Sequence, residues 1–174
     1  MIITIIGRIR SGKSTVRKMI QGYAEKRGVK LEHVRFADPI YKEVEDFYKR
    51  WNIPYRKFRP MFDAVGEALA EHGDNDKVLE TFKTKIDVHS NLITDDARRH
   101  AQADFLRKSG SIFIRVECAD KVRKDRCSRS EWTDAHISDT ELQYEKCDYT
   151  IHNGGNLAYL KELVDKVCDQ IFGD

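Results

Sequence analysis

The chain has 174 residues, the length of one compact domain, which at this size hides about 70% of the surface that the unfolded chain exposes. Its 31 basic and 29 acidic residues leave a net charge of only +2, which argues against a dedicated nucleic-acid or membrane-surface protein, since those carry a large basic excess. No apolar run approaches the roughly 18 residues of a membrane span, and residues 1–7 lack the basic start and cleavage site of a signal peptide. We therefore expect neither nucleic acid nor membrane as a partner.

The cysteines indicate a reducing compartment. Cys118, Cys127, Cys147 and Cys168 are 9, 20 and 21 positions apart and form no C-x-x-C pair or metal-ligand spacing. Four reduced thiols are typical of a cytosolic protein. The sequence therefore predicts a cytoplasmic location without disulfides.

Five short runs of β-branched and apolar residues are predicted to be strands, with helical patterns between them. The runs are Ile2–Ile6, His33–Phe36, Asn91–Thr94, Ser111–Val116 and Tyr149–Ile151. Because strands that alternate with helices form parallel βαβ units, we expect an α/β fold: a three-layer sandwich around a five-stranded parallel sheet.

The alternation is interrupted between the second and third predicted strands. Residues 38–90 hold only helical patterns, and the first of them begins with Asp38 as a plausible N-cap and Pro39 at the first helical position. Long excursions of this kind usually carry function. We therefore predict a single domain, 1–174, with a core formed by 1–37 and 91–174 and a helical insertion at 38–90.

Residues 7–14 (GRIRSGKS) match the pattern G-x-x-x-x-G-K-[ST], with a predicted strand before them and a helix after them. The glycines let backbone N–H groups turn toward an anion at a helix N-terminus. In this pattern the lysine reaches the β- and γ-phosphates of a nucleotide, and the Ser14 hydroxyl is a ligand of Mg²⁺. The residues expected to hold the phosphates of ATP are Gly7, Arg10, Ser11, Gly12, Lys13, Ser14 and Thr15.

Two adjacent carboxylates follow the third predicted strand, at the edge of the sheet where ligands bind. We expect Asp95 to hold Mg²⁺ and Asp96 to act in catalysis by orienting the acceptor. The sequence leaves open which of the two serves the metal. The alternative is that one of them only caps the helix that follows.

GTPase switches, motor-type ATPases and small-molecule kinases all use this phosphate-binding loop. A GTPase is disfavoured because residues 63–66 (DAVG) match its D-x-x-G pattern only inside a helical pattern, and residues 84–87 (TKID) lack the asparagine of its guanine-binding pattern. A motor would normally be longer and would carry a basic nucleic-acid face. The pattern therefore favours a small-molecule kinase.

A kinase also needs cations on the transferring phosphoryl group and a lid that excludes water. The basic segment 115–129 supplies candidates, and we expect Arg126 and Arg129 to be catalytic within a lid at about residues 118–135. The alternative is a solvated basic face.

Several further segments occur in a characteristic order. They are residues 36–42 (FADPIYK), 59–66 (RPMFDAVG), 96–98 (DAR) with 102–110 (QADFLRKSG), 136–142 (HISDTEL) and 149–157 (YTIHNGGNL). Together they resemble the deoxynucleoside monophosphate kinases of phages and prophages over nearly the whole chain. The resemblance implies a fold of the nucleoside monophosphate kinase type and Mg²⁺-dependent transfer of the γ-phosphoryl group of ATP to a deoxynucleoside monophosphate.

Carried over by position, the resemblance implies roles for four residues. Those expected to contact the acceptor are Asp38, Lys42, Arg59 and Arg98, and Arg98 is also expected to act on the migrating phosphoryl group. The chain departs from the family pattern at Arg99, His100 and Ala101, where the family often has an aromatic residue and an asparagine, and at Asp139, where a glutamate is commoner. These departures leave the base and sugar preference open. Ser138 and Glu141 also fit a helix capping box.

Two alternatives remain at the level of sequence. One is a related kinase with another acceptor, such as dephospho-coenzyme A. The other is a non-catalytic nucleotide-binding prophage protein that kept the loop and lost turnover. The expected partners are ATP and a nucleoside monophosphate, and a homodimer is left open.

Overall fold

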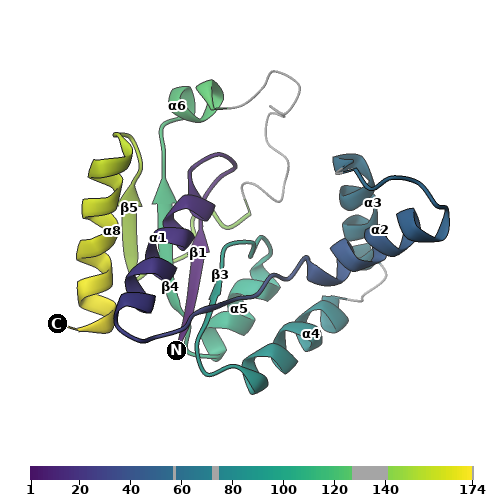
Figure 1. Ribbon diagram of the computed structural model, residues 1–174, viewed down its shortest axis with the longest axis horizontal. Coiled ribbons are helices and arrows are strands. Elements are labelled where there is room, and N and C mark those ends of the chain that lie inside the picture. Colours follow the sequence, from purple (N-terminus) through teal and green to yellow (C-terminus); the bar gives the residue numbers. More distant parts are fainter. Residues whose placement is uncertain (57, 72–74, 127–140, 174) are drawn as a thin grey trace. The chain divides into compact units, whose positions relative to one another are not determined.

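The computed structural model of the chain (Figure 1) describes residues 1–56, 58–71, 75–126 and 141–173. Five parallel strands form one sheet in the order β2-β3-β1-β4-β5. The strands are β1 (Ile2–Ile6), β2 (Glu32–His33), β3 (Leu92–Thr94), β4 (Ile112–Glu117) and β5 (Tyr149–His152). Ile3 of the central strand β1 pairs with Ile93 on one side and Ile112 on the other. The predicted five-stranded parallel sheet is confirmed.

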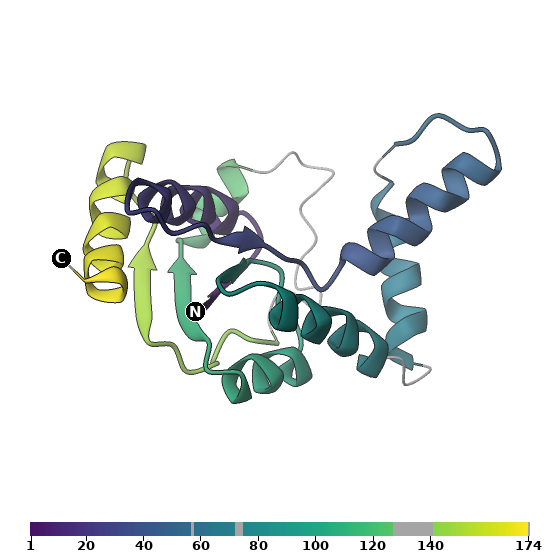
Figure 2. The same cartoon turned by 60° about the horizontal axis from the view of Figure 1, so that its bottom comes forward.

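Helices cover both faces of this sheet. Figure 2 shows α1 (Lys13–Lys26) and α8 (Leu157–Phe172) on one side of the strands and α5 (His100–Lys108) on the other. All residues of β1 and β3 are buried, as expected for parallel strands that are packed on both faces. The core cluster joins these strands to the apolar faces of α1 and α8. The three-layer α/β fold is therefore confirmed.

The second strand differs from its predicted range. The sequence placed it at His33–Phe36, whereas the structure has it at Glu32–His33. The apolar side chains of Val34 and Phe36 suggested a longer strand, but both are buried outside a strand rather than within one. The apolar pattern of a short buried run does not distinguish the two environments.

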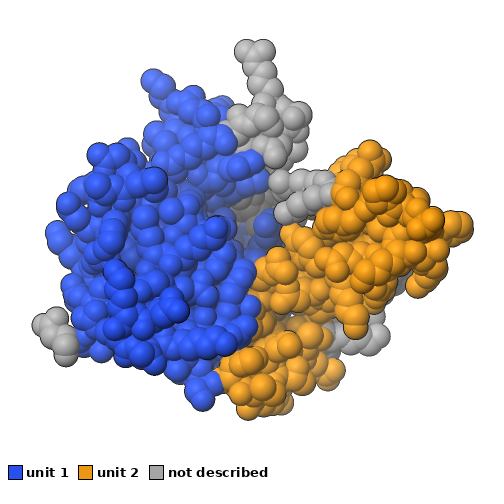
Figure 3. All heavy atoms as spheres, viewed as in Figure 1, with its two compact units in different colours: residues 1–33, 90–174 blue, residues 34–89 orange. Residues whose placement is uncertain are grey.

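The chain divides into two compact units (Figure 3): Met1–His33 with Ser90–Asp174, and Val34–His89. The second unit consists of α2 (Asp38–Arg50), α3 (Arg59–Glu71) and α4 (Asn75–Val88). Stacked rings of Phe36 and Phe82, with centroids 4.1 Å apart, and tilted rings of Tyr41 and Phe62, 4.7 Å apart, lie within it.

Asp38 does not cap α2. The N-cap position is Ala37, and no side-chain hydrogen bond caps this helix among the described residues. The carboxylate of Asp38 accepts hydrogen bonds from Arg35 instead. The predicted capping role is therefore wrong.

The described thiols Cys118, Cys147 and Cys168 are free, and Cys127 lies outside the described residues. Within the described part of the chain, no helix has the length and apolar character required to span a bilayer.

Candidate phosphate-binding site

The loop between β1 and α1 has a backbone that requires its two glycines. Gly7 has φ +149° and Gly12 has φ +102°, which side chains rarely allow. A Cβ atom on Gly7 would lie 2.4 Å from the carbonyl oxygen of Val116, and one on Gly12 would lie 2.2 Å from Nδ2 of Asn153. Glycine is therefore required at both positions by the backbone conformation and by the close packing around it.

The loop ends on the N-terminus of α1. The N–H groups of Thr15 and Val16 donate to the carbonyl of Gly12, both at 3.0 Å. The N-cap residue Gly12 makes no side-chain cap at this turn, and a helix N-terminus is a favourable position for an anion. Lys13 Nζ donates to the carbonyls of Gly7 at 2.5 Å and Arg8 at 3.0 Å. Its ammonium is thereby folded back over the loop.

Asn153 is a residue of this site that the sequence analysis missed. It follows β5, is only 5% exposed, and donates from Nδ2 to the carbonyl of Ser11 at 2.8 Å. Its own backbone N–H donates to the carbonyl of Glu117 at 2.7 Å. The turn signal of the following glycines was visible in the sequence, but nothing local indicated a buried partner for the amide.

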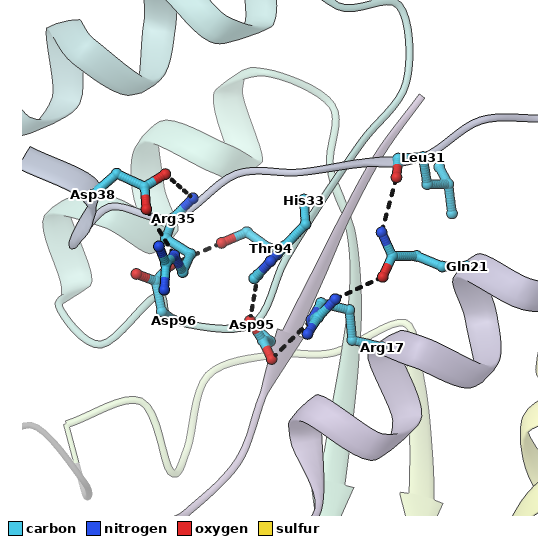
Figure 4. A network of polar contacts seen from close by, with 9 residues as sticks. All are labelled: Arg17, Gln21, Leu31, His33, Arg35, Asp38, Thr94, Asp95 and Asp96. Carbon is cyan, nitrogen blue, oxygen red and sulfur yellow. Dashed lines mark hydrogen bonds and ion pairs between the residues drawn. The ribbon is translucent and has the colours of Figure 1, made fainter. Parts of the chain in front are cut away.

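Asp95 lies at the end of β3 with its side chain 8% exposed. Its carboxylate accepts a hydrogen bond from Arg17 Nε at 3.2 Å and lies 2.8 Å from His33 Nε2 (Figure 4). The Ser14 hydroxyl at the start of α1 also favours the ionised form of Asp95. Burial alone would raise the pKa of Asp95, but the bond from His33, the charge of Arg17 and the Ser14 hydroxyl together lower that pKa to about 2.

This arrangement brings together two predicted metal ligands, Ser14 and Asp95. Arg17 and His33 were not predicted. Arg17 is itself oriented by the side chain of Gln21, whose Oε1 accepts from Arg17 Nη1 at 2.6 Å and whose Nε2 donates to the carbonyl of Leu31 at 2.9 Å (Figure 4). The helical spacing of Arg17 and Gln21 was the one signal in the sequence that could have linked them.

The neighbouring carboxylate has a different environment. Asp96 accepts a hydrogen bond from the buried Thr94 hydroxyl at 2.9 Å. Within the described residues, no three His, Cys, Asp or Glu side chains gather as a ready-made metal site. A magnesium ion here would need phosphate and water oxygens to complete its coordination, as Mg²⁺ sites in phosphoryl-transfer enzymes commonly do.

Among the described residues of the basic segment after β4, Arg123 is buried, whereas Lys121, Lys124 and Arg126 are exposed. In α6 (Asp120–Asp125), the guanidinium of Arg123 is 1% exposed and donates to the carbonyl of Ile9 in the loop at 2.8 Å. Arg126 is exposed, and its Nη1 lies 3.5 Å from Cys118 Sγ. Arg129 and the second half of the predicted lid, residues 127–135, lie outside the described residues. The sequence analysis gave Arg123 no separate role.

The residues near α5 form a further polar cluster. Arg98 is exposed. Glu141 accepts from Arg99 Nη1 at 3.1 Å and from the backbone N–H of His100 at 2.8 Å, so its carboxylate lies at the start of α5. The predicted capping box of Ser138 with Glu141 falls partly outside the described residues, as does Asp139.

The remaining acceptor candidates belong to the helical unit. Asp38 accepts from Arg35 Nε at 2.7 Å, and the Arg35 guanidinium carbon lies 4.6 Å from the centroid of the Tyr41 ring. Lys42 is exposed on α2. The side chain of Arg59 lies outside the described part of the structure. The sequence analysis gave Arg35 no role, although it directly precedes the segment 36–42.

Neither a protein-family model nor a curated protein matches the chain. Solved structures match along nearly its whole length. Shikimate kinase from Acinetobacter baumannii in complex with shikimate is 17% identical, with a TM-score of 0.58, over 98% of this chain and 92% of that one. The Mycobacterium tuberculosis APS kinase in complex with AMPPNP and APS is 13% identical, with a TM-score of 0.58, over 99% and 97%. Shikimate kinase from Aquifex aeolicus is 19% identical, with a TM-score of 0.55, over 99% and 97%. The chain therefore has the α/β fold of these P-loop kinases.

Proposed function

We propose that this protein is an ATP- and Mg²⁺-dependent kinase that transfers the γ-phosphoryl group of ATP to a deoxynucleoside monophosphate, giving the diphosphate and ADP. The observation that carries the proposal is the conformation of the glycine loop together with the buried Asp95 carboxylate that Arg17 and His33 hold at the end of β3. The kinase fold of the solved structures is consistent with it.

The loop would bind the phosphates of ATP through backbone N–H groups and Lys13. The residues proposed to contact the phosphates are Gly7, Arg10, Ser11, Gly12, Lys13, Ser14 and Thr15. The Lys13 ammonium, now on the loop carbonyls, would leave them for the phosphate oxygens, which are stronger acceptors because they are charged. Charge that develops on these oxygens during transfer is then stabilised by donors already in place.

The donor set beside the loop fits magnesium. Ser14 and Asp95 offer hydroxyl and carboxylate oxygens, which are the ligands that Mg²⁺ prefers. Bound there, the ion would neutralise charge on the phosphates. Arg17 and His33 keep the Asp95 carboxylate ionised and fixed in direction.

The acceptor residues are proposed from the family resemblance. Asp38, Lys42 and Arg59 would bind the deoxynucleoside monophosphate, and Arg98 would bind its phosphate or the migrating group. Asp96 would orient the acceptor oxygen. Arg126 and Arg129 would stabilise the transferring phosphoryl group, for which a planar guanidinium that never loses its charge is suited.

A coupled ADP-release assay tests the proposal. The wild type is supplied with ATP and, in turn, each of the four common deoxynucleoside monophosphates or dephospho-coenzyme A, with and without Mg²⁺. We expect ADP release that needs both Mg²⁺ and one of the monophosphates, and that is lost in Lys13→Ala. Turnover with dephospho-coenzyme A alone would assign a different acceptor. ATP binding without turnover on any acceptor would instead indicate a non-catalytic nucleotide-binding protein.

A further inference from the structure

Arg123 is the most unusual charged residue of the described structure because its side chain is 1% exposed. It lies on α6, a short helix in which its neighbours Lys121, Lys124 and Asp125 are exposed. A guanidinium cannot lose its charge, and burying a charge is costly unless it is paired and hydrogen-bonded. Its position therefore depends on its partners.

Those partners are the phosphate loop and the first residue of its own helix. Arg123 Nη1 donates to the carbonyl of Ile9 at 2.8 Å. Its Nη2 and Nε donate to Oδ1 of Asp120 at 2.9 and 3.3 Å. The two edges of the planar group are thus used for different purposes: one holds the loop, and the other is anchored by a carboxylate.

Asp120 makes a second connection between α6 and the loop, through Arg8. Nη1 of Arg8 donates to its two carboxylate oxygens at 3.1 and 3.3 Å. The hydrogen bond from Arg123, with the charges of Arg123 and Arg8, lowers the pKa of Asp120. Two consecutive loop residues are therefore held from α6, Ile9 through its backbone and Arg8 through its side chain.

The contact with Ile9 determines the direction of the next amide. In a planar trans peptide, the carbonyl of Ile9 and the N–H of Arg10 point in opposite directions. A guanidinium that holds this carbonyl toward α6 therefore aims the Arg10 N–H away from α6. Arg10 has φ +60°, a left-handed conformation that non-glycine residues seldom adopt and that must be held by its surroundings.

We propose that Arg123 is a positioning residue of the phosphate loop: through the Ile9 carbonyl it holds the Ile9–Arg10 peptide in its anion-binding orientation before ATP arrives. Asp120 is its anchor. The proposal rests on the proposed function only for its kinetic consequence, because the orientation of the loop is a property of the protein without nucleotide.

The test compares Arg123→Lys and Asp120→Asn with Lys121→Ala, a change to an exposed residue of the same helix. Arg123→Lys keeps the charge but has a single donating nitrogen in place of the fork, so it cannot hold Ile9 and Asp120 in the same geometry. Amide hydrogen exchange without nucleotide is followed at Ser11, whose N–H donates to the carbonyl of Arg8 at 3.1 Å. The dissociation constant of ATP and the thermal midpoint are measured on the same samples.

We expect faster exchange at Ser11 and an ATP dissociation constant about 10- to 100-fold higher in Arg123→Lys, since small misplacements of a binding group have effects of that size. Asp120→Asn should change both in the same direction, and Lys121→Ala should change neither. In steady-state assays the KM for ATP should rise while the KM for the acceptor stays the same.

Two results would overturn the proposal. One is a Ser11 exchange rate and ATP affinity in Arg123→Lys that equal those of Lys121→Ala. The other is a lower thermal midpoint with unchanged exchange and affinity, which would make Arg123 purely structural. If the wild type binds ATP but transfers no phosphoryl group, the proposed function fails, and the exchange and affinity measurements still decide the role of Arg123.

Discussion

The side-chain amide of Asn153 donates a 2.8 Å hydrogen bond to the carbonyl of Ser11, joining the turn after the last strand to the phosphate loop. The two residues are 142 positions apart in the chain. Gly12 leaves just enough room for this amide, because a Cβ atom at Gly12 would lie 2.2 Å from Nδ2. The loop and the turn after β5 are therefore built to fit each other.

Replacing Asn153 with Ala should destabilise the protein and weaken ATP binding together. The Ser11 carbonyl would lose its buried donor, which typically costs about 1–3 kcal/mol. Urea unfolding and ATP titration measure the two effects, with Thr150→Ala, an exposed residue of β5, as the control. An Asn153→Ala protein with the unfolding midpoint and ATP affinity of the wild type would show that this bond is dispensable.

Lys13→Ala should nearly abolish turnover and leave the fold intact. The ammonium acts on charge that develops during transfer, and the loss of one preorganised donor of this kind lowers kcat by about 100- to 1,000-fold. Circular dichroism and ADP release on the purified variant check both parts. Lys18→Ala, an exposed residue of the same helix, should behave as the wild type. More than a tenth of wild-type activity in Lys13→Ala contradicts the assignment of the loop.

Asp95→Asn and Asp96→Asn should have different effects on the magnesium requirement. Because Asp95 is the proposed metal ligand, Asp95→Asn should raise the Mg²⁺ concentration needed for half-maximal activity. Asp96 accepts a hydrogen bond from Thr94 instead. Asp96→Asn should therefore lower the rate at saturating Mg²⁺ without changing the Mg²⁺ concentration needed for half-maximal activity. Titrations of ADP release against Mg²⁺ distinguish the two effects. Wild-type titration curves and rates in both variants would mean that the metal ligand lies elsewhere.

The stability of the protein should fall in acid partly because of Asp95. Its pKa drops from 3.8 in the unfolded chain to about 2 in the fold, so its ionised form stabilises the fold by about 2 kcal/mol at neutral pH. A lowered carboxyl pKa gives stability that is complete well above pH 4 and is lost as the pH falls from about 4 toward 2.

The free energy of unfolding of the wild type and of Asp95→Asn, measured in urea at successive pH values, tests this dependence. We expect the variant to be less stable at pH 6 and the difference to shrink as the pH falls below about 4. A difference that stays constant or widens in acid would show that the ion pairs of Asp95 do not stabilise the fold.

Changes to Asp38 or Lys42 should affect the acceptor more than ATP. Asp38 is oriented by Arg35, and Lys42 is exposed one turn further along α2, whereas the phosphate loop lies in the other unit. Asp38→Asn and Lys42→Ala should therefore raise the KM for the acceptor, or lower its kcat/KM, with little change in the KM for ATP. Glu43→Ala serves as an exposed neighbour. Equal effects on both substrates count against this placement of the acceptor.

The sequence alone predicted the fold and the position of the glycine loop, because both have local signatures. Buried parallel strands require continuous apolar runs, and four of the five predicted strands have nearly the ranges observed. The loop requires glycines at two backbone positions and a lysine and a serine at the start of a helix. Local pattern was less reliable at Asp38, where a helix-capping residue and an ion-pair partner look the same in sequence.

Only the tertiary structure decided which polar side chains support the loop. Arg123 and Arg126 belong to one basic run, yet the first is buried against Ile9, 114 positions away, and the second is exposed. Asp95 meets Arg17 and His33, which are 78 and 62 positions away. Such pairs have no period and no spacing in the chain. They arise because parallel strands end at the same edge of the sheet, and the order of the strands determines which of these distant residues become buried together.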